Sequence, residues 1–193
     1  MNRTIQYYDK NAVEYAKRTR NADVNDLYTD FEACLEPGAR ILDLGCGSGR
    51  DSKYFLERGY DVVPTDGSRE MCRVAEQYLG IPVKQMLFSE LSCREEFDGI
   101  WACASLLHVP ERDFPDITEK VSAAIKPEGV LYASFKYGDS EEEIGGRHFT
   151  FYSENDLDWM FPDLGLIEYW ISEDVIPGRD NEKWLNILWR KME

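Results

Sequence analysis

The chain has 193 residues, and its 22 Lys and Arg against 37 Asp and Glu give a formal net charge of −15 at pH 7. This length fits a single domain, the shares of 43% hydrophobic and 31% charged residues argue against disorder, and no apolar run is long enough to predict a membrane span. A surface this acidic repels a phosphate backbone, so neither nucleic acid nor a membrane is expected as a partner.

Two helices are predicted before the first strand, because Tyr8, Ala12 and Tyr15 repeat at helical spacing and a second such pattern covers residues 27–35. From residue 40 onward, strands and helices alternate. The predicted strands span residues 40–44, 61–65, 81–87, 97–102 and 130–137. The predicted helices cover residues 48–58, a segment that begins at Ser68 and stops at Gly80, and a segment from Phe114 that ends at Lys126-Pro127.

The last third of the chain follows a different pattern. A helix is predicted over residues 153–161, and residues 138–146 are predicted as a loop able to act as a flap. Strands over 166–172 and 184–190 are joined by a short connection with Pro177-Gly178, which favours a hairpin. The whole pattern is typical of an α/β protein with a seven-stranded, mostly parallel sheet, one antiparallel strand, and helices on both faces.

Cysteine and histidine usage bears on metal sites and on location. The five cysteines include no C-x-x-C pair, and the only histidines are His108 and His148. We therefore expect neither a metal site nor a disulfide framework. The first residues also lack the apolar stretch of a secretory signal, so the prediction is a cytoplasmic protein with reduced thiols.

The most informative segment is Gly45-Cys46-Gly47-Ser48-Gly49, which follows Asp43 where a strand ends and a helix begins. Ligands bind at this place in open α/β sheets, and glycines there let the backbone turn tightly and approach a ligand. The helix N-terminus behind the glycines offers free N–H groups to an anionic group. Asp66 closes the next strand 21 residues after Gly45, where a carboxylate is able to accept hydrogen bonds from ribose hydroxyls.

The spacing of these glycines separates two kinds of nucleotide site. A dinucleotide-binding loop would place its third glycine at position 50, which is Arg50, whereas this chain has G-x-G-x-G after an acidic residue. On these residues the chain resembles the class I S-adenosylmethionine-dependent methyltransferases over about residues 7–190. Stretches such as Gly49-Arg50-Asp51 and Gly146-Arg147-His148 look like the small bacterial tellurite-resistance-type or methyltransferase-domain proteins.

The resemblance implies a Rossmann-like fold, with one methyltransferase domain over residues 1–193. N-terminal lid helices would cover residues 1–36 and the Rossmann-like core residues 37–193. It also implies S-adenosyl-L-methionine as the cofactor and a set of residues around it. In that set, Gly45, Cys46 and Gly47 wrap the amino-acid part, Asp43 orients the loop or the cofactor ammonium, Asp66 binds the ribose, Gly67 and Met71 touch the adenine, Leu87 and Phe88 hold it by apolar contact, and Ala102 and Cys103 lie near the sulfonium.

Residues outside the glycine loop supply candidates for the lid and for catalysis. Tyr8, Tyr15 and Arg18 fall on the first helix, either as a lid over the cofactor, with Arg18 paired to the cofactor carboxylate, or as simple packing and a solvated charge. His108 follows the fourth strand and either acts in catalysis or only ties down its loop. Lys136 and Arg147 are candidates to clamp an anionic acceptor, with a paired structural charge as the alternative for Lys136.

The leading functional hypothesis is a methyltransferase acting on a small-molecule acceptor. The alternatives are an RNA or protein methyltransferase, which a basic face would favour, and a non-catalytic S-adenosylmethionine-binding module, which would have a closed acceptor pocket. A nicotinamide-dependent oxidoreductase is disfavoured by the loop spacing. Because no base is paired with Cys46 or Cys103, both are interpreted as small packing residues and not as nucleophiles. No oligomeric state is indicated.

Overall fold

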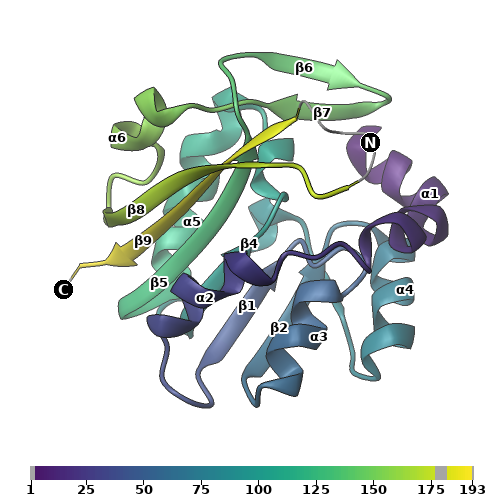
Figure 1. Cartoon of the computed structure of the whole chain (residues 1–193), viewed down its shortest axis with the longest axis horizontal. Coiled ribbons are helices and arrows are strands. Elements are labelled where there is room, and N and C mark those ends of the chain that lie inside the picture. Colours follow the sequence, from purple (N-terminus) through teal and green to yellow (C-terminus); the bar gives the residue numbers. More distant parts are fainter. Residues whose placement is uncertain (1–2, 177–181, 193) are drawn as a thin grey trace.

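The computed structural model describes residues 3–176 and 182–192, and its centre is a seven-stranded sheet (Figure 1). The strand order is β3-β2-β1-β4-β5-β9-β8. Strands β1 to β5 are parallel, and β9 is antiparallel to both of its neighbours. The strands of this sheet are β1 Arg40–Leu44, β2 Asp61–Asp66, β3 Lys84–Gln85, β4 Phe97–Ala102, β5 Ile125–Lys136, β8 Leu164–Glu173 and β9 Lys183–Lys191. The predicted fold class is thus confirmed.

Six α-helices of the described residues surround the sheet: α1 Arg3–Thr19, α2 Asn25–Ala33, α3 Arg50–Glu57, α4 Arg69–Leu79, α5 Phe114–Ala124 and α6 Leu157–Met160. Helices α2 and α3 cover one face through Tyr28, Phe31 and Phe55, whereas α5 covers the other through Ile117 and Val121 (Figure 1). Among the described residues, no helix combines the length and the apolar character that crossing a membrane requires.

The central strands are buried on both faces, which is why they are nearly continuous apolar runs in the sequence. In β5, every side chain from Val130 to Phe135 is at most 2% exposed. On the α2 face, Trp101 of β4 stacks on Tyr132 of β5 with ring centroids 3.9 Å apart. The Tyr132 hydroxyl donates to Asn186 Oδ1 of β9 at 2.8 Å, so this aromatic layer also fixes the antiparallel strand beside β5.

Local signals placed several elements correctly. Strands β1 and β4 have the predicted bounds. Ser68 caps α4 by accepting a hydrogen bond from the Met71 N–H at 3.1 Å, and the helix ends at Gly80, whose φ of +73° favours glycine. The predicted hairpin relation of the last two long strands is confirmed by the β8–β9 pairing, while Pro177 and Gly178 lie outside the described residues.

Three predicted boundaries are wrong. The strand predicted over residues 81–87 is only Lys84–Gln85, because the Val83 N–H donates to Glu76 Oε1 and the Leu87 N–H to Glu90 Oε2 instead of to a strand. Strand β5 begins at Ile125, directly after α5, and not at residue 130. The helix predicted over residues 153–161 is a 3-10 helix, Glu154–Asp156, followed by the short α6.

The segment predicted as a loop over residues 138–146 contains most of a β-hairpin. Strands β6 (Glu141–Ile144) and β7 (Arg147–Thr150) pair antiparallel around Gly145 and Gly146, which have φ values of +59° and +83°. All four side chains of β6 are exposed. A strand without a buried face shows no alternation of apolar and polar residues, so the sequence carried no strand signal there.

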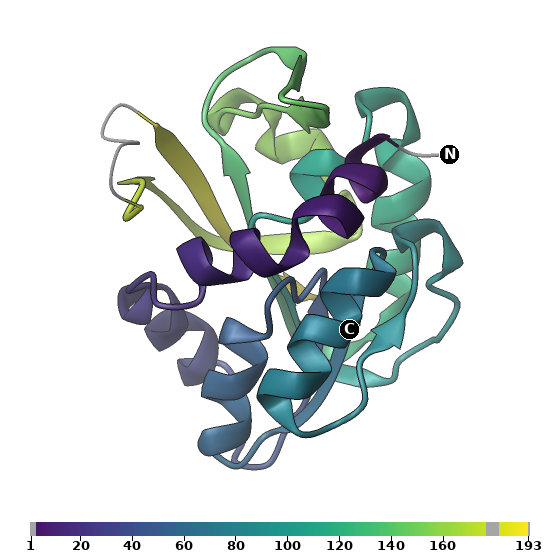
Figure 2. The same cartoon turned by 90° about the vertical axis from the view of Figure 1, so that its right-hand side faces the viewer.

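Helix α1 lies across the carboxyl edge of the sheet (Figure 2). Asp9 of α1 accepts hydrogen bonds from the Ser68 hydroxyl at 2.7 Å and the Glu70 N–H at 3.2 Å, which ties α1 to the start of α4. At the other side, Thr4 Oγ1 accepts from the His148 N–H of β7 at 2.9 Å. The helix is thereby held over the place where the glycine segment ends β1.

Candidate functional site

The glycine segment forms a tight turn between β1 and α3. Gly45 has a φ of +85°, and a Cβ at this position would lie 2.6 Å from the Cβ of Ser105, so both the backbone angle and the space require glycine. The N–H groups of Gly45 and Cys46 both donate to the Thr65 carbonyl, at 2.9 and 2.8 Å. The turn is therefore fixed against the end of β2 before any ligand arrives.

Asp66 ends β2 and completes this turn. Its Oδ2 accepts from the Gly47 N–H at 3.0 Å and its Oδ1 from the Ser68 N–H at 2.8 Å. Burial raises the pKa of Asp66 to about 6, although these two hydrogen bonds act in the opposite direction. An ionised carboxylate accepts about four hydrogen bonds, so Asp66 keeps capacity for the hydroxyls of a ligand.

Two further carboxylates lie beneath the turn. Asp43 accepts a short hydrogen bond from the Ser52 hydroxyl of α3, and burial, reinforced by the nearby Asp51, raises the pKa of Asp43 to about 8. Asp51 accepts from the Tyr28 hydroxyl at 2.6 Å and from Trp101 Nε1 at 2.9 Å. Burial opposes the ionisation of Asp51, but the Arg50 guanidinium and these hydrogen bonds outweigh it, and the pKa of Asp51 is lowered.

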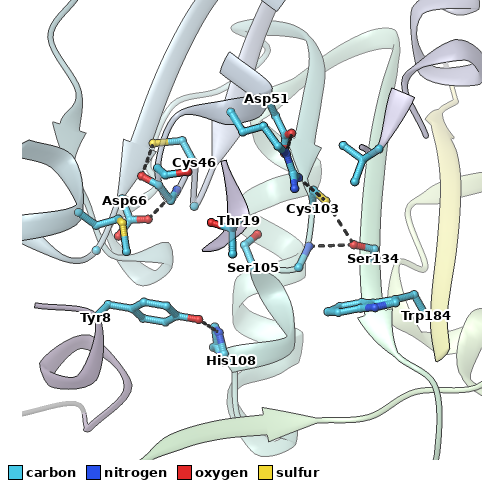
Figure 3. A pocket seen from close by; sticks show the side chains of 18 of the residues that line it. Tyr8, Thr19, Cys46, Asp51, Asp66, Cys103, Ser105, His108, Ser134 and Trp184 are labelled. Carbon is cyan, nitrogen blue, oxygen red and sulfur yellow. Dashed lines mark hydrogen bonds and ion pairs between the residues drawn. The ribbon is translucent and has the colours of Figure 1, made fainter. Parts of the chain in front are cut away.

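A pocket of about 1240 Å³ opens along the carboxyl edge of the sheet, between the glycine turn and α1 (Figure 3). Typical small-molecule sites measure about 300–1,000 Å³, so this one has room for more than one ligand. It brings together most of the residues that the sequence singled out. Those that line it are Tyr8, Tyr15, Gly45, Cys46, Gly47, Asp66, Gly67, Met71, Leu87, Phe88, Cys103 and His108.

Comparisons with known proteins agree with this geometry. Residues 41–129 match the family model described as a methyltransferase domain. YqeM of Bacillus subtilis (strain 168), whose name places it among the methyltransferases, is 30% identical over 154 residues, which cover 68% of this chain and 62% of YqeM. A ubiquinone biosynthesis O-methyltransferase of Alkalilimnicola ehrlichii is 32% identical over 122 residues, which cover 58% of this chain and 49% of that enzyme. The chain thus spans about half to three fifths of the length of these relatives.

Solved structures share the fold of the whole chain. A Burkholderia thailandensis 1,6-didemethyltoxoflavin-N1-methyltransferase, with bound 1,6-didemethyltoxoflavin and S-adenosylhomocysteine, has a TM-score of 0.78 at 21% identity, over 98% of this chain and 85% of that one. TehB from Haemophilus influenzae has a TM-score of 0.71 at 21% identity, over 92% of this chain and 65% of that one. Residues 41–129 thus match a methyltransferase domain, and the chain has the fold of an S-adenosylmethionine-dependent methyltransferase.

The residues around the glycine turn fit S-adenosylmethionine as the cofactor on two structural grounds. The turn at Gly45 leaves no room for a side chain, and Gly47 has only the Tyr15 ring, at 4.0 Å, near the place a Cβ would take, so backbone is exposed beneath the aromatic ring of α1. Asp66 stands beside the same turn with acceptor capacity to spare. When bound, S-adenosylmethionine supplies an activated methyl group on a sulfonium.

Five predicted site residues do not line the pocket; the sequence assigned Asp43, Ala102 and the cationic Arg18 to the cofactor or its sulfonium, and the cationic Lys136 and Arg147 to the acceptor. Asp43 lies beneath the turn and holds Ser52, so the structure leaves it no contact with a cofactor ammonium. Ala102 is fully buried at the end of β4 and packs in the core on the α5 face. Asp43 faces α3 and Ala102 faces α5, on opposite sides of the sheet, and neither side chain lines the pocket.

The other three are the predicted cationic residues. Arg18 lies on the exposed side of α1, since Ala12, Ala16 and Thr19 form the buried side of that helix. Lys136 pairs with Glu182 of the segment before β9, which is the structural alternative that the sequence left open. Arg147 packs between the rings of Tyr7 and Phe149, at 4.6 and 4.9 Å from their centroids. None of the three contributes to an anion clamp in the pocket.

His108 lines the pocket, but both of its ring nitrogens form hydrogen bonds within the protein. Its Nδ1 lies 2.6 Å from the His148 carbonyl oxygen, and its Nε2 lies 2.8 Å from the Tyr8 hydroxyl. A carbonyl only accepts, so Nδ1 carries the proton and Nε2 accepts from Tyr8. Burial lowers the pKa of His108 to about 4, which keeps the ring neutral and fixes α1 to the loop after β4.

Sequence reasoning missed a second group of pocket residues. They come from the end of α1 and the loop after it, from the first turn of α2, from the loop after β4, and from β5, β8 and β9: Thr19, Asp23, Asp26, Ser105, Ser134, Trp170, Ser172, Glu173, Trp184 and Asn186. None belongs to a short motif. The only signal for them is the pairing of β5 with β9 and of β9 with β8, which the sequence predicted without its register.

Proposed function

We propose that this chain transfers the methyl group of S-adenosylmethionine to a small-molecule acceptor bound beside the cofactor in the same pocket. The observation that carries the proposal is the continuity of this pocket of about 1240 Å³ from the glycine turn to the ends of β5, β8 and β9. A non-catalytic cofactor-binding module would need only the first part of that space. Methyl transfer requires both ligands to be held in contact and shielded from water.

In this proposal the cofactor occupies the part of the pocket around the glycine turn. Gly45, Cys46 and Gly47 face its amino-acid part, and Asp66 accepts hydrogen bonds from its ribose. Gly67, Met71, Leu87 and Phe88 line the part of the pocket next to Asp66 and would surround the base. Tyr8 and Tyr15, whose rings meet edge to face with centroids 5.1 Å apart, close the site from α1.

A small acceptor is favoured by the enclosure of the site and by charge. Side chains of α1, Tyr8 and Tyr15 among them, line the pocket, and the net charge of −15 opposes the phosphate backbone of RNA. The Alkalilimnicola ehrlichii relative is named for ubiquinone biosynthesis, and the Burkholderia thailandensis structure holds 1,6-didemethyltoxoflavin, so both names refer to small acceptors. We further propose, from the sequence, that the protein acts in the cytoplasm as a single domain.

Isothermal titration with S-adenosylmethionine, S-adenosylhomocysteine and NADH tests the cofactor part of the proposal. We expect the first two to bind and NADH not to bind. Replacement of Asp66 by alanine is expected to weaken S-adenosylhomocysteine at least tenfold, since two ribose hydroxyls lose a charged acceptor worth about 1.5–3 kcal/mol per hydrogen bond. If neither S-adenosylmethionine nor S-adenosylhomocysteine binds, the proposed function is wrong.

A matched pair of glycine variants separates the effect of a side chain in the glycine turn from the effect of backbone strain alone. Gly45→Ala places a methyl group 2.6 Å from Ser105 Cβ in the pocket, whereas Gly59 has a similar φ, +88° against +85°, and no atom within 4 Å of the added Cβ. Both variants bear the strain of a positive φ, about 1–3 kcal/mol. Only Gly45→Ala is expected to lose S-adenosylhomocysteine affinity by more than tenfold in the same titration; equal losses in both variants would contradict the assigned cradle.

A further inference from the structure

The pocket continues beyond the glycine turn onto the sheet face that α2 leaves uncovered. Ser134 of β5, Asn186 of β9 and Trp170 of β8 are paired in one row across the sheet. Trp184 and Ser172 form the next row toward the rim. We call these five residues, with Cys103, the acceptor lobe; all six line the pocket. In Figure 3, Cys103, Ser134 and Trp184 lie on one side of Ser105, with Asp66 and Tyr8 on the other.

The walls of the acceptor lobe are aromatic, and its polar groups are already held in place. Trp170 and Trp184 are half-buried, and the indole N–H of Trp184 donates to Asp174 Oδ2 at 3.1 Å. The Asn186 side chain accepts from the Tyr132 hydroxyl and donates to Ser172 Oγ at 2.9 Å. Fixed indole rings present flat apolar faces, so the lobe suits a planar ring system.

The charge at the mouth of the lobe is negative. Asp23, Asp26 and Glu173 line the pocket, are exposed, and form no ion pair with a lysine or arginine of residues 3–176 or 182–192. Two cations beside the lobe are each paired: Arg50 binds both oxygens of Asp51, at 2.6 and 3.0 Å, and Lys136, whose Nζ lies 5.7 Å from the Trp184 ring centroid, pairs with Glu182. Lys120 also lines the pocket, but from α5 on the other face of the sheet. An anion entering the lobe therefore meets repulsion, and a cation meets attraction.

A separate observation points to a ligand between the two parts of the pocket. Ser105 is only 5% exposed, lines the pocket, and its hydroxyl has no hydrogen-bond partner in the part of the chain that the structure describes. A buried hydroxyl without a partner costs about 1–3 kcal/mol. Figure 3 places Ser105 at the centre of the pocket, so a polar atom of a bound molecule would remove this cost.

We propose that the acceptor is a planar aromatic molecule with an uncharged nitrogen nucleophile, bound between the tryptophans of the acceptor lobe and hydrogen-bonded to Ser105. This inference rests on the proposed function. In the reaction the nitrogen lone pair forms a bond to the methyl carbon while the carbon–sulfur bond breaks and its electron pair stays on sulfur. The positive charge passes from sulfur to nitrogen, where it stays on a ring nitrogen or leaves as a proton. The acidic mouth and the tryptophan faces favour that cation.

Three probes of one ring system test the charge preference: quinoline, N-methylquinolinium and quinoline-6-carboxylate. Each is titrated into the protein with and without saturating S-adenosylhomocysteine, which is itself titrated first. We expect N-methylquinolinium to bind at least as tightly as quinoline, and the carboxylate at least tenfold more weakly. With S-adenosylmethionine, quinoline is expected to yield N-methylquinolinium by mass spectrometry.

The outcomes separate the two proposals. If S-adenosylhomocysteine binds but the carboxylate equals or exceeds the cation in affinity, or no probe binds, the acceptor proposal is wrong and the proposed function stands. If the probes bind in the expected order but S-adenosylhomocysteine does not, the lobe binds aromatic cations in a protein that is no methyltransferase, and both proposals fall.

Single-residue variants test whether probe affinity and charge preference arise in the acceptor lobe and its acidic mouth. Trp184→Ala is expected to weaken quinoline at least tenfold, whereas Trp184→Phe keeps most of the affinity by keeping an aromatic face. Glu173→Gln, at an exposed position, is expected to lower the preference for cation over carboxylate about threefold, in keeping with one screened charge. Glu168 is exposed on the same strand but does not line the pocket, so Glu168→Gln is the control. Equal effects of the two glutamate variants would overturn the role of the acidic mouth.

Discussion

His108 shows how one residue changes meaning between sequence and structure. A histidine after the fourth strand invites a role as a base, yet both ring nitrogens are engaged, with Tyr8 of α1 on one side and the His148 carbonyl of β7 on the other. A base needs a free lone pair directed at the acceptor. The geometry therefore favours the alternative that His108 holds its loop, and adds that it also holds α1.

The titration of His108 gives a prediction about stability. Its folded pKa of about 4 lies below the ordinary 6.5, so the unfolded chain takes up this proton first and wild-type stability falls as pH drops from 6.5 toward 4. Asp43 and Asp66, with pKa values raised to about 8 and about 6, act in the opposite direction. Because His108→Gln keeps Asp43 and Asp66, the difference in stability between this variant and the wild type cancels the contributions of those two carboxyls.

We expect the wild type to lose up to about 3 kcal/mol relative to His108→Gln between pH 7 and pH 4, because one pKa unit corresponds to about 1.4 kcal/mol. Urea unfolding of both proteins at intervals across this range measures the difference. A difference that stays constant with pH would mean that His108 is protonated alike in the folded and unfolded chains.

At the scale of single residues, the sequence predicted what depends on short spacing. Gly45, Gly47 and Asp66 meet because a β-turn-α unit brings the ends of adjacent parallel strands together. Ser134 and Asn186 lie opposite each other only because of the β5–β9 register. A shift of one residue would turn each to the other face, and no local signal in the sequence fixes that register.

Helix α1 is the element on which access to the pocket depends. It carries Tyr8 and Tyr15 over the glycine turn and is fastened in its N-terminal half, by Thr4 to β7 and by Asp9 to the start of α4. We expect a ligand of the size of S-adenosylmethionine to enter and leave when this cover opens. The fastening contacts are therefore expected to set the rate of ligand exchange.

Removal of Asp9 tests this function of α1. Asp9→Ala deletes the acceptor for the Ser68 hydroxyl and the Glu70 N–H. Loss of two such hydrogen bonds is worth about 1–3 kcal/mol. We expect roughly tenfold faster dissociation of S-adenosylhomocysteine in stopped-flow measurements, together with faster amide hydrogen exchange in residues 3–19.

A matched control lies on the same helix. Glu14 is exposed and, among the residues that the structure describes, forms an ion pair with Lys17 at 2.7 Å, so Glu14→Ala removes a charge from α1 without touching its fastening. This variant is expected to exchange hydrogen and release the ligand as the wild type does. Equal acceleration in both variants would show that Asp9 acts through helix stability and not through the contact with α4.

At the scale of elements, prediction succeeded where burial imposes a pattern. Strands β1 and β4 are buried on both faces and were delimited correctly. Strand β3 is shorter than the sequence predicts, because the backbone N–H groups of Val83 and Leu87 donate to the side chains of Glu76 and Glu90 instead of to a neighbouring strand. The β6–β7 hairpin was missed because the exposed β6 carries three consecutive glutamates, which suggest a solvated loop.

The whole molecule combines a fold that it shares with solved structures and a net charge of −15. The seven-stranded order is shared with solved structures at about 21% identity, so the fold itself does not specify the acceptor. This chain combines a net charge of −15 with a pocket whose mouth bears Asp23, Asp26 and Glu173. Global charge and the local mouth favour the same kind of ligand, uncharged or cationic.

The domain organisation leads to a last prediction. Helix α1 packs on α4 and β7, and the pocket is lined by residues from α1 through β9, so we expect residues 1–193 to unfold as one unit. Differential scanning calorimetry should then show one transition. S-adenosylhomocysteine at one hundred times its Kd adds about 2.7 kcal/mol, which corresponds to a rise in Tm of about 5–11 °C for a domain of this size. Asp66→Ala should remove most of this rise. Two transitions, of which the ligand shifts only one, would show instead that the N-terminal helices and the core are separate cooperative units.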